Sequence, residues 1–245
     1  MELQGKKVLV VGSGISGMGA IEALHQAGAV SFLFDGNDKL SVEDVRKKMK
    51  PGIEAQIEIG TLSEATSDAI DLVILSPGVP TDTEFVENFR RRGIKIWGEI
   101  ELAYEMGKGR VIGITGTNGK TTTTTLVGEI MSACYADVDV VGNIGNPYTL
   151  TALDATQETV TVAEISSFQL ETVEQFKPDV SAILNITPDH LNRHHTMENY
   201  AAAKEAVTRN QTKEQVCVLN YENAYTREIG ARCPARVVWF SSKRK

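Results

Sequence analysis

The sequence predicts an α/β protein with two successive units, each built on a parallel sheet covered by helices. Two observations predict this fold class. Strand-like runs rich in Val and Ile alternate with helical stretches, which is typical of parallel strands joined by crossover helices. The same pattern then starts again at Arg110 with another apolar strand, a glycine-rich turn and a helix. A chain of 245 residues with 42% hydrophobic content can bury a core of this kind.

The first unit is expected to alternate between strands and helices. Its strands are short runs rich in β-branched residues, and its helices are longer stretches between them. The expected strands are Lys7–Val11, Val30–Phe34, Ile53–Ile59, Asp71–Leu75 and Ile94–Trp97, and the expected helices lie near Gly17–Ala27, Val42–Met49 and Thr83–Arg92.

The second unit is expected to repeat this alternation. Its strands are Arg110–Thr115, Thr159–Ile165, Val180–Ile186, Gln215–Leu219 and Arg236–Phe240, with helices from about Gly119 to Met131 and around Tyr200–Arg209. A boundary is predicted at Glu105–Arg110, because two glycines and two basic residues there separate a helix from the next buried strand. We therefore expect a first domain over residues 1–107 and a second over residues 108–245.

The composition argues against several classes of protein. The formal net charge of −7 disfavours a nucleic-acid-binding surface, because affinity for a polyanion comes from clustered Lys and Arg. No apolar run reaches the roughly 18 residues of a membrane span, and the chain starts without a signal-peptide pattern. Three cysteines without a CxxC pair indicate neither a disulfide framework nor a zinc cluster. We expect a cytoplasmic protein with no membrane or nucleic-acid partner.

The first glycine loop, Gly12–Gly17, follows a strand and opens a helix, and the next strand ends in Asp35. This is the dinucleotide-binding pattern of a Rossmann-like domain, in which glycines allow a tight turn and close approach to a phosphate. A nicotinamide or flavin cofactor, a different nucleotide and a ligand-free turn all stay open, because no obvious hydride-transfer residues follow. The turn Ser76–Pro80 lies at the same sheet edge and is either a ligand contact or a proline-shaped loop.

The second glycine loop, Gly113–Thr121, joins an apolar strand to a helix and resembles a P-loop. Its amides are suited to hold phosphate oxygens, Lys120 to neutralise the β and γ charges, and the Thr121 hydroxyl to reach Mg²⁺. It departs from the P-loop sequence pattern, which has glycine five residues before the second glycine, because Ile114 stands at that position before Gly119. The sequence therefore predicts a P-loop-type α/β ATPase domain after the first domain.

Three polar residues downstream are candidates for metal and phosphate chemistry. Glu164 ends a buried strand, and a carboxylate leaving a strand toward a phosphate loop can hold a metal. His190 follows another buried strand and could bind metal or orient phosphate. Lys204 lies in an expected helix. Taken singly, each also has an ordinary structural interpretation as a strand-end acid, a loop histidine or a surface lysine.

At this point the motifs resemble those of the Mur ligase family over essentially the whole chain. The specific matches are Gly116–Thr121, Gly142–Gly145, Glu164–Glu171, Leu184–Leu191 and Tyr200–Lys204. The stretch from Ser166 to Glu171 points to the family member that adds D-glutamate. The resemblance implies an ATP-dependent ligase of peptidoglycan precursor synthesis, with roles in cell-wall biogenesis, cell shape, division and the cell cycle.

The resemblance also implies a mechanism and a set of site residues. ATP would phosphorylate the terminal carboxylate of UDP-N-acetylmuramoyl-L-alanine, the amine of D-glutamate would attack the acyl phosphate, and phosphate would leave. Lys120, His190 and Lys204 would be catalytic. The residues implied for ATP are Gly116, Thr117, Asn118, Gly119, Lys120, Thr121 and Thr122; those for magnesium are Thr121, Glu164, His190 and a carbamylated Lys204; those for the UDP-sugar are Ile15, Ser16, Asp35, Gly36, Ser76, Pro77, Gly78 and Asn143.

Three departures from the family pattern keep alternatives open. Gly36 stands where a polar side chain is expected, and Asn192 stands where an aspartate is usual. Family members continue beyond the length of this chain, so we expect a C-terminally truncated ligase, with its last domain absent, that forms little or no product alone. The alternatives are another Mur-type or folylpolyglutamate-type ligase, an NAD-dependent oxidoreductase, and a non-catalytic nucleotide-binding module.

Overall fold

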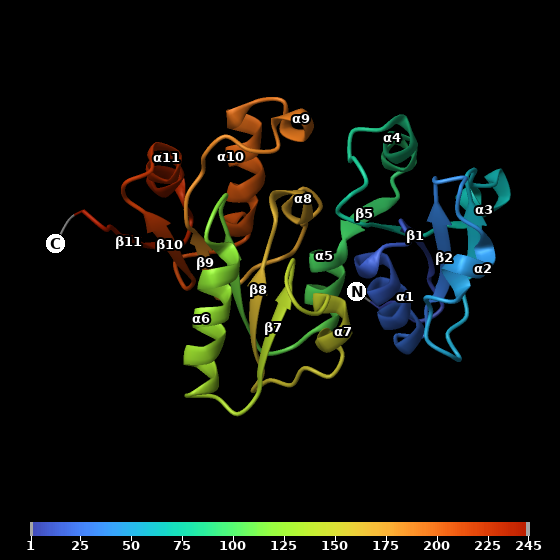
Figure 1. The fold of residues 1–245 in the computed structure, drawn as a ribbon, viewed down its shortest axis with the longest axis horizontal. Helices are drawn as coiled ribbons and strands as arrows, with labels where there is room; N and C mark the ends of the chain where they lie inside the picture. The colour runs from blue at the N-terminus through green and yellow to red at the C-terminus, as the bar shows by residue number, and fades with distance from the viewer. Residues whose placement is uncertain (1, 244–245) are drawn as a thin grey trace.

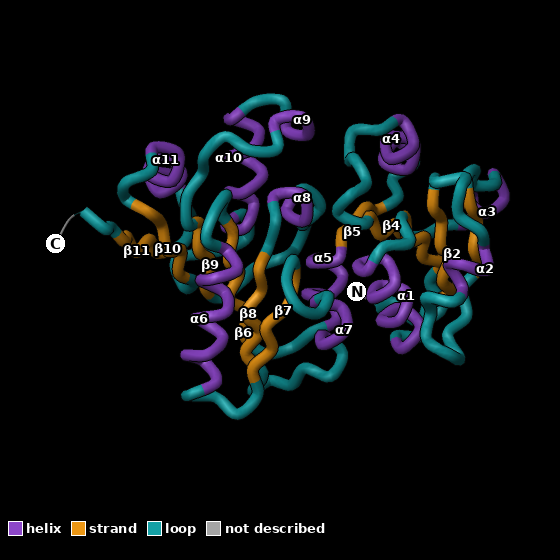
Figure 2. Tube along the Cα trace, viewed as in Figure 1, coloured by secondary structure: helices purple, strands orange, loops and turns teal. Residues whose placement is uncertain are grey.

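A computed structural model describes residues 2–243 as two β-sheets with helices around and between them (Figures 1 and 2). The first sheet has the strand order β3-β2-β1-β4-β5, and the second has the order β11-β10-β9-β6-β8-β7. The strand pairs in both sheets are parallel. Helices α1, α5 and α7 lie between the sheets. The predicted α/β class with two parallel-sheet units is confirmed.

The first sheet is buried on both faces. Its elements are β1 Lys7–Val11, α1 Ile15–Gln26, β2 Val30–Asp35, α2 Val42–Arg46, β3 Gln56–Ile59, α3 Glu64–Ala69, β4 Leu72–Leu75, α4 Glu84–Arg91 and β5 Lys95–Gly98. Val8 and Val10 of β1 pack in the core that includes α1. Leu9 and Val11 point the other way, into the core that includes α4. This alternation places helices over both faces, as a parallel sheet requires.

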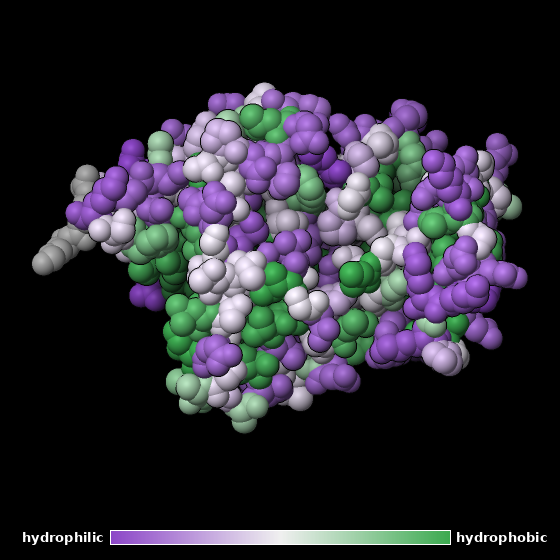
Figure 3. All heavy atoms as spheres, in the orientation of Figure 1, coloured by the Kyte–Doolittle hydropathy of each residue, from purple (hydrophilic) through white to green (hydrophobic). Residues whose placement is uncertain are grey.

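The second sheet is accompanied by α6, which has 13 residues and is the longest helix in the described part of the chain. Its elements are β6 Arg110–Thr115, α6 Lys120–Ser132, β7 Val138–Gly142, α7 Tyr148–Ala152, β8 Val160–Glu164, α8 Ser167–Leu170, β9 Val180–Ile183, α9 Leu191–His194, α10 Met197–Glu205, the 3-10 turn Ala206–Thr208, β10 Val216–Asn220, α11 Ala224–Arg232 and β11 Arg236–Phe240. Figure 3 shows apolar side chains gathered over α6, where Leu126 and Ile130 are exposed. Strand β6, at the sheet centre, leads directly into the second glycine loop.

Several elements differ from the expected ones for local reasons. Strand β3 begins at Gln56 and not at Ile53, because Ile53 still belongs to a turn at Gly52, where its N–H donates to the Lys50 carbonyl over 3.2 Å. Strand β9 ends at Ile183 because the chain then bends toward the second glycine loop, where the Asn185 carbonyl accepts from Thr117. Helices α3, α7, α8, α9 and α11 and strand β7 were not expected from the sequence.

Helix α5, Glu99–Met106, belongs to both cores. Ile100 and Ala103 pack in the core of the second sheet, whereas Leu102 packs in the core of the first. The helix therefore fixes the two sheets relative to each other. The division at residues 107 and 108 stays a prediction.

The structure also bears on membrane-spanning segments and on the cysteines. Within residues 2–243, no helix combines the length and the apolar character needed to cross a membrane. Cys134, Cys217 and Cys233 are free thiols.

A buried carboxylate on α5 holds the chain that follows α8. Glu101 is fully buried and accepts hydrogen bonds from the backbone N–H groups of Glu174, Gln175 and Phe176 at 2.8, 2.6 and 3.1 Å. Burial raises the pKa of Glu101, and the three N–H donors act against that shift. The carboxylate thereby satisfies three backbone donors that would otherwise be buried without a partner.

Replacing Glu101 by Gln is expected to lower the free energy of unfolding by about 1–3 kcal/mol, because the amide offers one oxygen to these donors and leaves an N–H unsatisfied. Urea denaturation followed by circular dichroism measures the change. Glu129→Gln, at an exposed position on α6, is the matched control and should leave the midpoint unchanged. Equal midpoints for the two variants would contradict the assigned role.

Candidate functional site

The second glycine loop ends in a helix start that is open to an anion. Gly119 precedes α6 with φ +83°, in the left-handed region that L-residues rarely adopt, so glycine is needed there. No side chain in the described part of the chain caps α6. The first amides of the helix are therefore suited to bind phosphate oxygens, with the helix dipole adding to the attraction.

The loop itself is anchored to the end of β9. The N–H of Thr117 donates to the Asn185 carbonyl over 2.9 Å, and the N–H of Asn118 donates to the Asn185 side-chain oxygen over 2.9 Å. Lys120 folds back over the loop, and its Nζ donates to the carbonyls of Gly116 and Thr117 at 3.1 and 2.9 Å. The lysine charge thus lies at the loop, where an incoming phosphate would be bound.

Glu164 joins two of the predicted site residues. It lies at the end of β8 with 1% of its surface exposed. Its Oε2 accepts from the Thr121 hydroxyl over 2.8 Å, and its Oε1 accepts from the Asn143 side-chain amide over 2.9 Å. The structure therefore brings together Thr121 and Glu164, both predicted for a metal, and Asn143, predicted for the substrate.

Lys204 is buried beside the same loop. Its Nζ donates to the Gly116 carbonyl over 2.8 Å, the oxygen that also accepts from Lys120, and it lies 4.5 Å from the centre of the Tyr200 ring. Burial, together with the nearby Lys120 charge, lowers the pKa of Lys204 to about 7. A lysine that sequence alone places on the surface is thus in the interior, with only 1% of its surface exposed.

His190 occupies an unusual backbone conformation at the start of α9. Its φ is +53°, which is uncommon outside glycine. The side chain is half exposed, lies 3.4 Å from Asp189 through Nε2, and packs against the Phe168 ring at 4.9 Å. Its ring is 6.5 Å from the Tyr200 ring, on which Lys204 also lies. No hydrogen bond links His190 to Lys204 in the described residues, so the two share surroundings without direct contact.

The first glycine loop is held by Asp35 at the end of β2. The Asp35 carboxylate accepts from the Ser13 N–H and hydroxyl at 2.8 and 2.6 Å and from the Asn37 N–H at 3.0 Å. A Cβ on Gly17 would stand 1.9 Å from the Gly12 carbonyl oxygen, so only glycine permits this approach of helix to strand. The loop geometry matches the dinucleotide-type pattern, with Ile15 78% exposed beyond it.

The turn after β4 lies against the first glycine loop. Ser76 donates through Oγ to the Gly12 carbonyl over 3.3 Å. Arg193 of α9 donates to the Val79 carbonyl over 2.9 Å and to Glu171 over 2.6 Å, which ties this turn to the second sheet. Pro77 is partly buried and Gly78 is exposed. Gly36, after β2, is exposed too.

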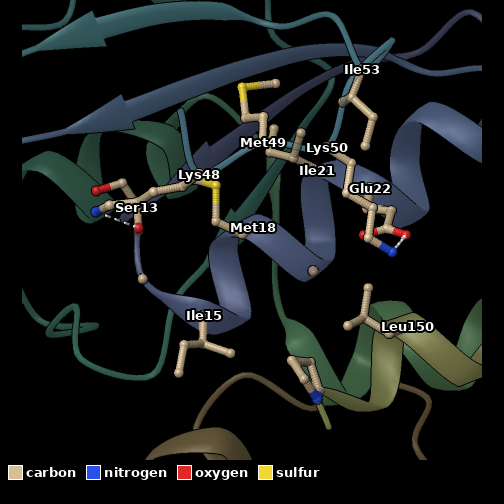
Figure 4. A pocket seen from close by; sticks show the side chains of 13 residues that line it. Ser13, Ile15, Met18, Ile21, Glu22, Lys48, Met49, Lys50, Ile53 and Leu150 are labelled. Carbon is tan, nitrogen blue, oxygen red and sulfur yellow. Dashed lines mark hydrogen bonds and ion pairs between the residues drawn. The ribbon is translucent and has the colours of Figure 1, made fainter. Parts of the chain in front are cut away.

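A pocket of about 410 Å³ opens beside the first glycine loop (Figure 4). It is lined by α1, the segment 48–53 and the start of α7, through Ser13, Gly14, Ile15, Met18, Gly19, Ile21, Glu22, Lys48, Met49, Lys50, Ile53, Pro147 and Leu150. Lys48 lies next to Ser13, with Nζ 3.5 Å from the Ser13 carbonyl. Lys48 was not expected at a site from the sequence, because nothing in the local pattern separates it from other exposed lysines.

The pKa of Asp35 is lowered: burial opposes its charge, but the hydrogen bonds from Ser13 and Asn37 and the Lys48 charge outweigh burial. Because the pKa of Asp35 is lower in the folded state, its ionisation stabilises the fold at pH values above the ordinary pKa of 3.8. This stabilisation is lost as the pH falls below 3.8. Asp35→Asn should therefore flatten the fall in melting temperature below pH 4 in an acid series. Asp38→Asn, at an exposed position in the same loop, is the control. If melting temperature falls with pH equally steeply in the two variants, the effect assigned to Asp35 is refuted.

The chain matches two family models and a group of named bacterial proteins. Residues 6–98 match the Mur ligase MurD-like N-terminal domain, and residues 114–245 match the Mur ligase middle domain. UDP-N-acetylmuramoylalanine--D-glutamate ligase of Lachnoclostridium phytofermentans is 56% identical over all 245 residues, and that of Clostridioides difficile is 46% identical over 246 aligned residues. Each match covers 54% of the relative, so the chain spans about half the length of these relatives.

Solved structures agree with the fold. The UDP-N-acetylmuramate-alanine ligase of Thermotoga maritima superposes with a TM-score of 0.57 at 23% identity, over 98% of this chain and 53% of that one. At this identity the likeness supports the fold alone.

Proposed function

The chain belongs to the Mur ligase family, and we propose that it supplies the nucleotide-sugar site and phosphate loop of an ATP-dependent amide-forming ligase. The proposed reaction joins D-glutamate to UDP-N-acetylmuramoyl-L-alanine through an acyl phosphate, in the cytoplasmic synthesis of peptidoglycan precursors. The relatives that carry this name match the chain from end to end. The proposal includes a role in cell-wall growth, and thereby in cell shape and division.

The observation that carries this proposal is the position of Glu164. Its carboxylate accepts from Thr121 of the second glycine loop and from Asn143, which the family pattern assigns to the sugar substrate. A reaction between ATP and a substrate carboxylate needs both groups held at one place. An oxidoreductase would need only the first glycine loop and leaves this arrangement unexplained.

The second glycine loop suits ATP. We assign the phosphates to the backbone of residues 116–122 and to the Lys120 ammonium, whose present acceptors are two loop carbonyls. Phosphate oxygens would replace these carbonyls as stronger, charge-assisted acceptors. Lys120 would then offset the negative charge that accumulates where a phosphate and a carboxylate approach each other.

The residues present also suit magnesium. Thr121 and Glu164 offer oxygen atoms 2.8 Å apart, and Mg²⁺ prefers oxygen ligands with few protein contacts. When bound, the ion would screen the negative groups brought together in the reaction. We assign a second ion to His190 and Lys204. A carbamylated Lys204 would present oxygens in place of an ammonium, and its lowered pKa supports the neutral amine that carbamylation requires.

The first glycine loop and its neighbours suit the UDP moiety. We assign the nucleotide to Ile15, Ser16, Asp35, Gly36, Ser76, Pro77 and Gly78, with Asn143 toward the sugar. Exposed Ile15 offers an apolar surface to a base, and the start of α1 has no side-chain cap and can bind an anion. Lys48 adds a positive charge beside the first glycine loop, in the pocket that Ile15 also lines.

Calorimetric titration distinguishes the proposal from a dinucleotide enzyme. We expect the purified chain to bind UDP-N-acetylmuramoyl-L-alanine and not NADH, because the relatives that match the whole chain are named for the UDP-sugar. Heat from NADH without heat from the UDP-sugar would overturn the substrate assignment.

Lys48→Gln should weaken UDP-sugar binding about three-fold at low salt, the modest effect of a solvated cation on an anion. Lys47→Gln is the matched control, because this neighbouring lysine is paired with Asp44 on the surface. Titrations at two salt concentrations measure both variants. Identical affinities and salt dependence for the two would exclude Lys48 from the site.

A further inference from the structure

Glu99 is a buried carboxylate between the two sheets that the proposed function does not use. It is the first residue of α5, and only 2% of its surface is exposed. Its Oε2 accepts from the Ser16 hydroxyl over 3.0 Å, and its Oε1 accepts from the Tyr148 N–H over 2.6 Å. The donors come from α1 at the first glycine loop and from α7 in the second unit. Glu99 thus bridges the two parts of the molecule.

A third donor extends the bridge toward Glu164. Gln169 of α8 donates through Nε2 to Glu99 over 3.3 Å. The Gln169 oxygen is already occupied, because it accepts from the Ser166 N–H and hydroxyl at 2.9 and 3.0 Å. This fixes the orientation of the amide, so Nε2 must face Glu99. Hydrogen bonds therefore run from Ser16 through Glu99 and Gln169 to Ser166, two residues after Glu164.

The hydrogen bond to Glu99 also decides how Ser16 can meet a ligand. A serine hydroxyl has one proton to donate. Here that proton is directed to Glu99, and the backbone N–H at the start of α1 is left for an anion. The hydroxyl therefore acts as an anchor that holds the helix start in place.

We propose that Glu99 is a positioning residue for the nucleotide-sugar: it fixes Ser16, and with it the amides of the first glycine loop, against Gln169 of the second unit. The inference rests on the proposed function, because it concerns the same ligand. A loop held in its binding conformation loses less freedom on binding, which raises affinity without any direct contact to the ligand.

A double-mutant cycle tests this role with UDP-N-acetylmuramoyl-L-alanine as the calorimetric probe. Glu99→Gln retains the side-chain shape but offers its donors one oxygen in place of two, and we expect Kd to rise about ten-fold. Ser16→Ala removes the same anchor from the other side and should have a similar effect. If both act through one contact, the double variant will bind no more weakly than the weaker single variant.

Glu101→Gln is the matched control for general damage. This second buried carboxylate, on the same helix, has no contact with the first glycine loop among its hydrogen bonds to residues 174–176. It should lower thermal stability while leaving Kd within about two-fold, a difference too small to indicate a lost interaction. If Glu101→Gln lost as much affinity as Glu99→Gln, the rise in Kd would follow from general loss of stability, and the proposal would be overturned.

A second variant keeps the test decisive if Glu99→Gln fails to fold. Gln169→Met removes the amide that meets Glu99 and should raise Kd at least three-fold, without further loss when combined with Ser16→Ala. An unchanged Kd in Glu99→Gln and Gln169→Met would refute the role of Glu99. The same conclusion would follow if the fold-increase in Kd of either variant multiplied with that of Ser16→Ala in the double variant. If the unaltered chain does not bind the UDP-sugar, the proposed function fails and this inference with it.

Discussion

The two buried carboxylates of α5 constrain much of the molecule. A carboxylate out of water is costly unless donors surround it, so the segments that supply those donors must stay where they are. Glu101 takes its donors from the chain after α8, and Glu99 takes them from α1, α7 and α8. One helix therefore determines how the first glycine loop lies relative to the second sheet.

This constraint gives the site its composite character. Each sheet presents a glycine loop at the carboxyl end of a central strand, which is where open parallel sheets bind ligands. The residues proposed for the site come from both units: Asn143 follows β7 and Glu164 ends β8 in the second, and Ser16 and Asp35 belong to the first. The hydrogen bond from Asn143 to Glu164 lies within the second unit, whereas the bridge through Glu99 joins the second unit to the first glycine loop.

Local patterns were enough to predict the features that depend on neighbouring residues. Strands β1, β6 and β11 have the expected bounds, and both glycine loops join a strand to a helix as expected. Strand β7 was missed because Asp137 and Asp139 interrupt its apolar pattern, and α7 because it has only five residues. The burial of Lys204 and the contacts of Glu99 depend on residues far away in sequence, which no local pattern encodes.

The membership of α5 in both cores has a consequence for how the protein unfolds. If Ile100 and Ala103 leave the second core, Leu102 leaves the first with them, because all three are on one rigid helix. The two sheets therefore unfold cooperatively, in a single thermal transition in place of two independent ones. A fragment cut after residue 107 would retain α5 but expose Ile100 and Ala103, and the complementary fragment would lose these two residues from its core.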